Sequence, residues 1–326
     1  MQMASLESIK HIIAPDLKRL NDRIREKLMS SNPMMNKVIT SFLETKGKQI
    51  RPIIVLLTAR MLGEVNDNTL SAAASVELLH NASLIHDDVV DNSMMRRGVP
   101  TINAIWDNHI AVLVGDFFVS TAMQQAISTA DVRIIDALCY LGKLLSIGEL
   151  DQIYNARSHQ LSEEAYFRII NYKTASLFVA CAKMGCYSVN APEKDVDVAT
   201  KFAELLGLCF QIRDDIFDYF PSDKVGKPTG NDLKEGKITL PLLHTLMDES
   251  LPYCAEMRAL AEKDSLTDDE IDTLIHYAID NGGIDYAYDK MAELRSQARD
   301  LISALPDNEA RSSLLSVLDS IITREY

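Results

Sequence analysis

The chain has 326 residues, 47% of them hydrophobic, with a formal net charge of −14 and a sequence pI near 4.9. This length is enough to bury a large core, in one large domain or two ordinary ones. The acidic balance argues against a nucleic-acid-binding protein, which normally presents a basic face. It does not exclude a small anionic substrate, because local cations or metal ions can override the global charge.

The cysteines and the amino terminus predict a cytoplasmic protein. The 5 cysteines are odd in number and show no Cys-x-x-Cys spacing, so we expect free buried thiols in a reducing compartment. Residues 1–13 lack the basic start and long apolar stretch of a signal peptide. The most apolar run, residues 52–62, is shorter than the roughly 20 residues that cross a bilayer. We therefore expect no transmembrane segment.

Helical periodicity dominates the chain from its first element to its last. Apolar residues recur at helical spacing near the amino terminus and again at the carboxyl end, over residues 9–20 and 314–322. Strand-like alternation is scarce, and only 13 glycines and 10 prolines interrupt the pattern, which predicts long helices and short loops. Breaks are predicted at residues 31–33, 63–68, 97–101, 190–192, 221–230, 280–283 and 306–308. With no repeat or linker, the sequence predicts one all-α domain over residues 1–326, a layered helical bundle.

Two acidic motifs of one pattern, Asp-Asp-x-x-Asp, interrupt strongly apolar helical stretches. Their members are Asp87, Asp88 and Asp91 in the first motif and Asp214, Asp215 and Asp218 in the second. Residues i and i+4 lie one above the other on a helix, so the first and last aspartates of a motif can hold one ion together. Carboxylates buried without a positive partner are costly. Because magnesium binds one or two carboxylates together with substrate phosphates, the pair of motifs predicts magnesium rather than a solvated helix face.

A di-iron carboxylate site is the alternative metal centre that these acidic residues suggest. Such a site in a helical bundle needs Glu-x-x-His on two helices. Glu77 and His80 form one match, and we find no second copy in the sequence. The magnesium interpretation is therefore favoured.

Basic side chains bracket both acidic motifs. Arg96 and Arg97 follow the first motif, and an arginine pair offers forked contacts to phosphate oxygens. Residues 46–51 place three cations around a glycine just ahead of a predicted helix. The polar loop 221–230 follows the second motif, with Lys237 beyond it. In a chain this acidic, the joint pattern predicts a diphosphate-binding site.

The two motifs, their order and the Arg-Arg-Gly sequence after the first resemble the trans-isoprenyl diphosphate synthases, a family of all-helical homodimers. The resemblance is specific over residues 46–237 and closest to the long-chain, octaprenyl-type enzymes that feed quinone side chains. It implies an isoprenoid-synthase bundle around a central cavity and three magnesium ions per active site. It also implies isopentenyl diphosphate and an allylic diphosphate as substrates, with transient membrane contact at product release.

The resemblance also implies roles for individual residues. The six motif aspartates would bind magnesium. Isopentenyl diphosphate would contact Lys48, Arg51, His80 and Arg97. The allylic diphosphate would contact Arg96, Lys173, Thr174, Gln211, Lys227 and Lys237. The catalytic set would comprise the first-motif aspartates with Lys173, Thr174, Gln211 and Asp214, and Asp232 would help organise the lysine-bearing loop.

One departure from the family pattern is visible before the first motif. The family usually has Gly-Gly-Lys-Arg-x-Arg-Pro, whereas this chain has Lys46 at the first glycine and Gln49 at the first arginine. Lys48, Arg51 and Pro52 remain. We expect a modest effect on affinity rather than a loss of function.

The expected chemistry is ionisation of the allylic carbon–oxygen bond followed by attack of the isopentenyl double bond. Metal ions and basic side chains would stabilise the leaving diphosphate. The site must exclude water, and loop 221–230 is the expected part of a lid. The family implies that released diphosphate takes the proton while Thr174 and Gln211 steady the cation. His86, beside Asp87, is interpreted as a partner of the metal ligands rather than as a general base.

Small residues one turn before the first motif predict a long product. In this family a bulky aromatic at Ala82 or Ser83 would block the growing tail, and Leu79 lies further along the same helix. A helical turn rises about 5.4 Å, roughly one isoprene unit, so we expect about six to ten units, with octaprenyl as the single choice. The floor of the tunnel is left open among residues 117–127 of a later helix.

Three other functions stay open at this point. A short-chain farnesyl or geranylgeranyl diphosphate synthase would share the motifs. A class I terpene cyclase shares the fold but generally has an Asn/Ser/Glu second metal site and does not need Lys48, Arg51 and His80. A non-catalytic partner subunit would tend to lose one aspartate motif, and this chain keeps both.

Overall fold

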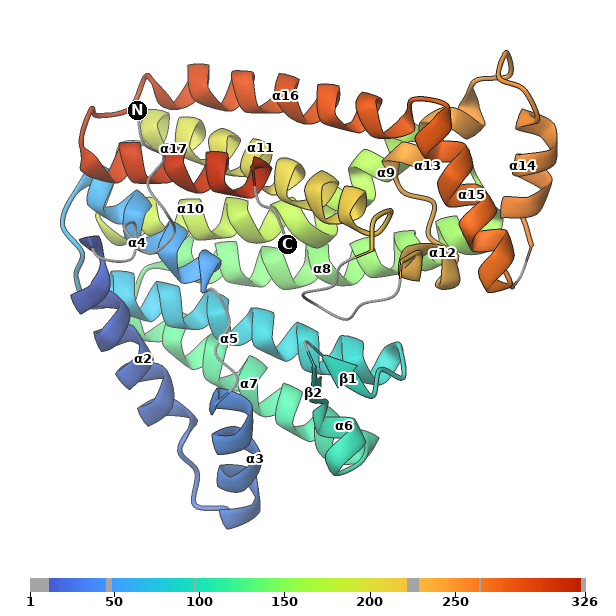
Figure 1. Cartoon of the computed structure of the whole chain (residues 1–326). Coiled ribbons are helices and arrows are strands. Elements are labelled where there is room, and N and C mark those ends of the chain that lie inside the picture. Colours follow the sequence, from blue (N-terminus) through green and yellow to red (C-terminus); the bar gives the residue numbers. More distant parts are fainter. Residues whose placement is uncertain (1–11, 45–48, 97, 222–228, 264, 324–326) are drawn as a thin grey trace. The chain divides into compact units, whose positions relative to one another are not determined.

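The computed structural model describes residues 12–44, 49–96, 98–221, 229–263 and 265–323 (Figure 1). These residues are helical almost throughout, so the all-α prediction is confirmed. The chain divides into two compact units, which are described separately. Unit 1 comprises residues 1–142, 177–203 and 301–320, and unit 2 comprises residues 143–176, 204–300 and 321–326. A single domain over residues 1–326 stays a prediction.

Unit 1 contains the amino-terminal helices and the first acidic motif. Its elements are α2 (Ala14–Leu28), α3 (Pro33–Glu44), α4 (Ile50–Leu62), α5 (Asp67–Val90), β1 (Met95–Arg96), β2 (Val99–Pro100), α6 (Ile102–Ile105) and α7 (Asn108–Ser128). It also holds parts of α8 (Val132–Ser158), α10 (Ser176–Ser188), α11 (Glu193–Phe217) and α17 (Glu309–Ile322).

Helix α5 forms the centre of unit 1 because small and apolar residues occupy nearly all of its faces. Its first turn is fixed by a capping box, in which the Asn66 side chain accepts the Thr69 amide and Thr69 Oγ1 accepts the Asn66 amide. Ala72, Ala73, Ala74 and other small side chains are fully buried. A helix that is apolar all round is stable only when it is surrounded by other elements. Helix α5 accordingly packs against α4 and α7.

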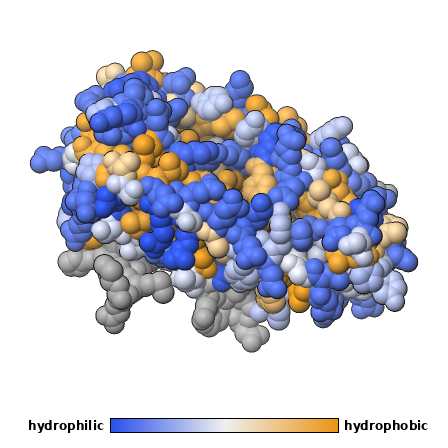
Figure 2. All heavy atoms as spheres, turned by 90° about the horizontal axis from the view of Figure 1, so that it is seen from above, coloured by the Kyte–Doolittle hydropathy of each residue, from blue (hydrophilic) through white to orange (hydrophobic). Residues whose placement is uncertain are grey.

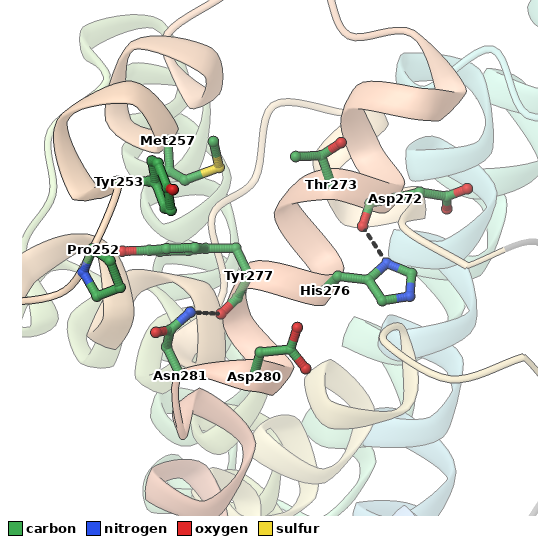
Figure 3. Close-up of a pocket in the computed structure, with 9 residues that line it drawn as sticks. All are labelled: Pro252, Tyr253, Met257, Asp272, Thr273, His276, Tyr277, Asp280 and Asn281. Atoms are coloured by element: carbon green, nitrogen blue, oxygen red, sulfur yellow. Dashed lines mark hydrogen bonds between the residues drawn. The ribbon is translucent and has the colours of Figure 1, made fainter.

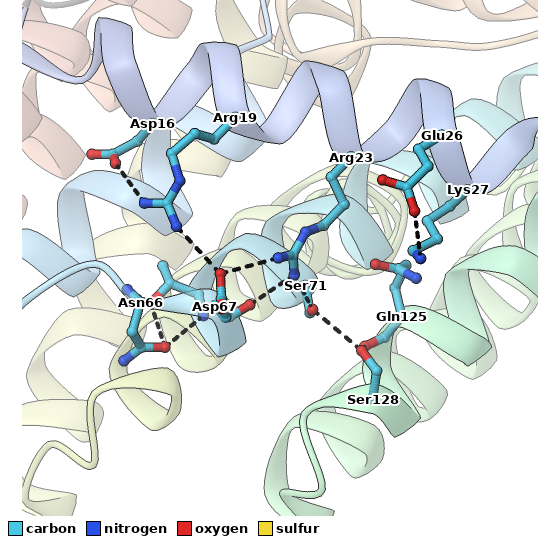
Figure 4. A network of polar contacts seen from close by, with 11 residues as sticks. Asp16, Arg19, Arg23, Glu26, Lys27, Asn66, Asp67, Ser71, Gln125 and Ser128 are labelled. Atoms are coloured by element: carbon cyan, nitrogen blue, oxygen red, sulfur yellow. Dashed lines mark hydrogen bonds and ion pairs between the residues drawn. The ribbon is translucent and has the colours of Figure 1, made fainter.

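A polar network ties α2 to α5 and α7 in unit 1 (Figure 4). Asp67, at the start of α5, accepts hydrogen bonds from Arg19 at 3.2 Å and Arg23 at 3.1 Å. Arg23 also donates to Ser71 Oγ at 2.6 Å, which in turn accepts from Ser128 Oγ at 3.2 Å. A carboxylate at a helix amino terminus is favourable because it faces the positive end of the helix dipole. The network therefore fixes the first turn of α5.

Within the described residues, α7 is the one helix long and apolar enough to cross a membrane by length and composition, with 44% of its apolar window buried. A helix in the core of a protein meets the same test. Helix α7 packs closely along α5, and its buried face carries Val114, Phe118 and Ala122. The packing of α7 against α5 within unit 1 therefore accounts for a helix that is both long and apolar.

Unit 2 contains the second acidic motif and an apolar cluster of its own. Its elements are the remaining parts of α8 and α11, α9 (Glu163–Ile170), the π-helix η1 (Asn171–Ala175), α12 (Asn231–Lys234), α13 (Leu240–Met247), α14 (Cys254–Ala261), α15 (Asp268–Asp280) and α16 (Gly283–Ile302). The cluster joins Tyr219 to Leu242, Leu246 and Leu274, so the residues that follow α11 are anchored on α13 and α15.

Most predicted breaks coincide with helix ends, and the structure also contains breaks that the sequence did not predict. A two-residue strand pair, β1–β2, forms where Gly98 has a φ of +77°. Two further helix ends lie beside Ala130 and His159, which have φ values of +53° and +50°. These residues adopt the left-handed conformation that usually favours glycine, so the sequence carries no glycine or proline signal there.

The cysteines are all thiols, as predicted, although one of them is exposed. Four cysteines are buried and Cys139 is exposed. Burial raises the pKa of both Cys186 and Cys209 to about 12, which makes these two thiols unreactive near neutral pH.

The surface in Figure 2 shows hydrophobic residues distributed among hydrophilic ones on the face in view.

Candidate active site

The first acidic motif lies at the carboxyl end of α5. Asp87 is half-buried, Asp88 is buried, and Asp91 is exposed and forms the C-cap, donating its amide to the Asp87 carbonyl at 2.8 Å. The carboxyl end of a helix carries the negative end of its dipole, which favours a nearby cation. Asp87 and Asp91 therefore present two partly accessible carboxylates, one turn apart, where a cation is stabilised.

The middle aspartate of the first motif is held by the arginine that follows it. Arg96 Nε and Nη2 both lie 2.8 Å from Asp88 Oδ1, and Asp88 is only 7% exposed. The turn after α5 is fixed by Ser93, whose amide donates to the Asp88 carbonyl at 2.9 Å. Asp88 thus places the Arg96 guanidinium beside the motif.

The His86 side chain contacts residues of α7. Its Nε2 lies 3.3 Å from the Val112 carbonyl oxygen and 3.5 Å from Asp116 Oδ1. A Cβ atom on Gly115 would lie 2.2 Å from His86 Nε2, so only glycine leaves room for this ring. These contacts of His86 are thus with α7, and its role as a partner of the metal ligands stays a prediction.

The residues predicted for isopentenyl diphosphate are described only in part. Arg51 is half-buried in the first turn of α4, and His80 on α5 is 7% exposed. Burial raises the pKa of Cys181, an effect that the nearby positive charge of Arg51 opposes. Lys48 and Arg97 lie outside the described residues, as does Lys227 of the allylic set.

The predicted chain-length residues separate onto two faces of α5. Leu79, Ser83 and Asp87 are spaced four apart and are all half-buried, so they form one accessible stripe that leads away from the motif. The Ser83 hydroxyl donates to the His80 carbonyl at 2.9 Å. Ala82 is 0% exposed and belongs to the packed interior. Of the residues considered for the floor, Phe118 is buried, while Met123 and Ile127 are 48% and 60% exposed.

The second motif lies at the carboxyl end of α11 and repeats the burial pattern of the first. Asp214 and Asp218 are half-buried, whereas Asp215 is 3% exposed. Asp215 Oδ2 accepts a hydrogen bond from the Tyr166 hydroxyl at 2.5 Å, and Oδ1 accepts from Gln211 Nε2 at 2.7 Å. Burial and the neighbouring Asp232 charge raise the pKa of Asp215 well above its usual range, although both hydrogen bonds oppose that shift.

Asp218 organises the segment that follows the loop. Its carboxylate oxygens accept the Asn231 amide at 3.1 Å and the Asp232 amide at 2.9 Å, at the start of α12. The Asp232 carbonyl in turn accepts the Lys237 amide at 2.8 Å. The final aspartate of the motif therefore determines where the backbone of Lys237 lies. Loop 221–230, the expected lid, lies mostly outside the described residues.

Lys173 and Thr174 lie on the π-helix η1. A π-helical turn widens the backbone and often marks a functional site. Lys173 forms an ion pair with Glu149 and donates to Gln152 Oε1 at 3.0 Å, while Thr174 Oγ1 donates to Gln211 Oε1 at 2.6 Å. Gly148 permits this arrangement, since a Cβ there would lie 2.8 Å from Lys173 Cγ.

A cavity of about 200 Å³ in unit 2 brings together most of the predicted residues of that unit. It is lined by Lys173, Thr174, Gln211, Asp215, Asp232 and Lys237, with Ile169, Ile170, Ile238 and Leu243 as an apolar side. Lys173 pairs with Glu149 and Lys237 with Glu235. The cavity combines cations for a diphosphate with an apolar wall for a hydrocarbon.

A larger and shallower depression in unit 2, about 580 Å³, contains none of the predicted residues (Figure 3). It is formed by the start of α14 and one face of α15. His276 Nδ1 donates to the Asp272 carbonyl at 2.7 Å, and the Asn281 side chain donates to the Tyr277 carbonyl at 2.8 Å. These polar side chains bond to backbone carbonyls of α15 itself, and the residues lining the depression include no lysine or arginine for a phosphate group.

The donor set fits magnesium. Among the described residues, no group of three or more His, Cys, Asp or Glu side chains converges to hold a metal unaided. Asp87, Asp91 and Asp214 supply partly accessible carboxylate oxygens at helix carboxyl ends. Magnesium typically combines one or two carboxylates with substrate phosphates and water, so the Asp87 and Asp91 carboxylates of unit 1 and the Asp214 carboxylate of unit 2 each suit it.

Comparisons with known proteins agree with this geometry. Residues 32–278 match the family model described as polyprenyl synthetase. The octaprenyl diphosphate synthase of Haemophilus influenzae is 34% identical over 325 residues, covering 99% of this chain and 98% of the relative. A Caulobacter crescentus CB15 polyprenyl synthase, solved with calcium and isoprenyl diphosphate, is 30% identical with a TM-score of 0.90, covering 99% of each chain. A geranylgeranyl pyrophosphate synthase from Bacteroides thetaiotaomicron is 40% identical with a TM-score of 0.84, covering 97% of this chain and 98% of its own.

The all-α fold and the paired aspartate motifs define an isoprenoid chain-elongating enzyme, a trans-prenyltransferase. The chain belongs to the polyprenyl synthetase family. The resemblance identified in the sequence is therefore confirmed. The roles of individual residues stay predictions.

Two residues of the cavity region were missed by sequence reasoning. Tyr166, which donates to Asp215, is 49 positions away in the chain, and Glu149, which pairs with Lys173, lies on α8. Neither belongs to an acidic or basic motif. The one available signal was Ser162, a capping residue that starts α9 and so places Tyr166 on a helix.

Proposed function

We propose that this enzyme condenses isopentenyl diphosphate with an allylic diphosphate to give a long-chain all-trans polyprenyl diphosphate of six to ten units and diphosphate. The observation that carries the proposal is the cavity of unit 2, whose lining combines Lys173 and Lys237 with an apolar side and with Asp215 of the second aspartate motif. The similarity to an octaprenyl diphosphate synthase supports the product length. Small Ser83 on the accessible stripe of α5 supports it as well.

We propose that Asp87, Asp91 and Asp214 hold magnesium ions, which act as Lewis acids toward the diphosphate leaving group. Lys173, Lys237 and Arg96 would contact the allylic diphosphate, exchanging their carboxylate partners for phosphate oxygens. Arg51 and His80, together with Lys48 and Arg97, would bind isopentenyl diphosphate. The calcium bound in the Caulobacter relative supports a divalent cation, and three ions per site is our proposal for this chain.

Thr174 and Gln211 would direct polar atoms at the allylic cation, and the apolar side of the cavity would exclude water from it. Excluding water protects the cation until the isopentenyl double bond attacks it. Released diphosphate would then take the proton. Preorganised dipoles of this kind stabilise charge as it develops, without reorganisation during the reaction.

We further propose that the enzyme is a cytoplasmic homodimer whose product serves as a quinone side chain after transient membrane contact. Exposed apolar residues on α7 support a self-association surface: Leu113, Met123 and Ile127 are 58%, 48% and 60% exposed. Light scattering of the purified chain tests this, with Ile127→Lys as the variant. A dimer that becomes monomeric supports the surface, and a monomeric wild type refutes it.

The function is tested by a product assay. Purified protein is incubated with magnesium, farnesyl diphosphate and labelled isopentenyl diphosphate, and dephosphorylated products are sized by chromatography. A ladder ending at six to ten units supports the proposal. An end at four units favours a short-chain enzyme, as the similarity to the Bacteroides geranylgeranyl pyrophosphate synthase allows. Absence of incorporation with magnesium favours the partner-subunit alternative, and a matched EDTA sample tests the metal requirement.

A further inference from the structure

Four side chains of unit 2 form a continuous line of hydrogen bonds that ends at the cavity. Tyr166 donates to Asp215 Oδ2 at 2.5 Å, and Gln211 Nε2 donates to Asp215 Oδ1 at 2.7 Å. Thr174 Oγ1 and Gln211 Oε1 are 2.6 Å apart. Three elements, α9, α11 and η1, contribute to this line.

The donors and acceptors along this line follow a consistent order in the structure. Because Gln211 directs its amide nitrogen to Asp215 Oδ1, its carbonyl oxygen faces Thr174. A threonine hydroxyl has one hydrogen and two lone pairs, so Thr174 uses its hydrogen on Gln211. If Asp215 carries a proton on Oδ2, that proton donates to the Tyr166 oxygen, but Oδ1 still accepts from Gln211, so the orientation of Gln211 and Thr174 is unchanged. The remaining lone pairs of Thr174 are therefore available to the cavity that Thr174 lines.

We propose that Tyr166 and Asp215 are positioning residues, which lock the Gln211 amide so that Thr174 presents an electron-rich oxygen to the allylic cation. The inference rests on the proposed function and deepens it. It also argues against Asp215 as a magnesium ligand, because each carboxylate oxygen already accepts a hydrogen bond from a protein donor and the side chain is buried. At 3% exposure, Asp215 is far less accessible than the half-buried Asp214.

The burial of these hydrogen bonds explains why the direction of each one matters. An oriented dipole in a water-excluded site stabilises a developing charge strongly, and the same dipole pointing the wrong way destabilises it. A glutamine amide has two nearly isosteric orientations. With no acceptor at Asp215, the Gln211 amide is no longer held in one of them, and Thr174 can then turn its hydrogen toward the cation.

The kinetic test compares two tyrosine hydroxyls, each of which donates a hydrogen bond to a carboxylate. One bond joins Tyr166 of α9 to Asp215, and the other joins Tyr286 to Glu163 of α9. Tyr166→Phe removes the donor to Asp215, and the control Tyr286→Phe removes a hydrogen bond of 2.8 Å to Glu163, also on α9. We expect Tyr166→Phe to lower kcat about tenfold and Asp215→Leu, which removes the acceptor for Gln211, about 100-fold, the range typical of lost hydrogen bonds to charged or transition-state groups. The KM for farnesyl diphosphate should stay within about twofold of wild type, as should kcat of Tyr286→Phe.

A binding test separates positioning from metal ligation. Calorimetric titration with inorganic diphosphate and magnesium should give Asp215→Asn a Kd within about twofold of wild type, whereas Asp214→Asn weakens binding at least about tenfold. Equal weakening in both variants would show that Asp215 is a metal ligand and overturn the inference. So would a kcat for Tyr166→Phe equal to that of Tyr286→Phe.

The wild-type arm distinguishes failure of this inference from failure of the proposed function. Turnover by wild type with an unaffected Tyr166→Phe variant refutes the hydrogen-bond line alone. If wild type does not incorporate isopentenyl diphosphate, the proposed function fails, and the inference that rests on it fails too. Circular dichroism confirms that each variant is folded, and Thr174→Ser, which keeps the hydroxyl, should retain kcat within about fivefold while Thr174→Val does not.

Discussion

Replacing Ser83 by tyrosine places a bulky ring on the accessible stripe of α5. Ser83 lies four residues before Asp87, which corresponds to about 6 Å along the helix axis at 1.5 Å per residue. That distance is close to the length of one isoprene unit. A tail that follows the stripe reaches the ring early in elongation, so products should end at about three or four units.

The size of the effect follows from the cost of overpacking. Forcing extra carbon atoms into a filled space costs about 1–3 kcal/mol, which slows each elongation step beyond the ring by about 5- to 150-fold. Leu79 lies one further turn along the stripe, so Leu79→Phe should stop elongation about one unit later. Ala82→Phe should also shorten products, but Ala82 is 0% exposed and the added ring should destabilise the fold as well.

The assay is the same magnesium-dependent incubation with farnesyl diphosphate and labelled isopentenyl diphosphate. Ser83→Ala is the matched control and should leave the product distribution unchanged, since it removes only a hydroxyl bonded to its own helix. An active Ser83→Tyr enzyme that makes the wild-type distribution would refute the placement of the tail along this stripe.

Three further predictions test other parts of the structure. Asp87→Ala or Asp214→Ala should lower turnover at least about 1000-fold while circular dichroism stays unchanged, because each removes an accessible carboxylate at a helix end; near wild-type turnover would contradict the metal assignment. Gly148→Ala should raise the KM for farnesyl diphosphate about tenfold, because its Cβ would lie 2.8 Å from Lys173 Cγ; an unchanged KM would mean that this contact does not position the lysine. The hydrogen bond from Lys263 holds the pKa of the half-buried Glu270 carboxyl at about 2 against an ordinary 4.5. The stabilising effect of this carboxylate is therefore complete above about pH 4.5 and is lost as pH falls toward 2. The melting temperature of Glu270→Gln should therefore be lower than wild type at pH 7, and the difference should disappear at low pH; a difference independent of pH would contradict the assignment.

The fold class and the chemical class followed from the sequence because both depend on short-range patterns. Helical periodicity and the scarcity of glycine and proline predicted helices, and capping residues such as Asn66 and Thr267 begin them in the structure. The spacing within each Asp-Asp-x-x-Asp motif placed its first and last aspartates one turn apart. That geometry is a property of a single helix, so no knowledge of packing was needed.

The sequence did not distinguish the aspartates of one motif from each other. Within each motif the middle aspartate, Asp88 or Asp215, is buried and bonded to protein donors, while its neighbours stay accessible. Burial depends on which side of the helix meets other elements. A motif written along the chain contains no such information.

The sequence by itself determined that this protein is an all-α enzyme with two aspartate motifs and cations suited to a diphosphate. Only the tertiary structure decided which side chains act together. Tyr166 reaches Asp215 across 49 positions of sequence, and Glu149 pairs with Lys173 because Gly148 lets η1 approach α8. Such partners are set by the packing of distant helices, because a hydrogen bond or an ion pair requires atoms to be close in space and places no condition on their separation along the chain.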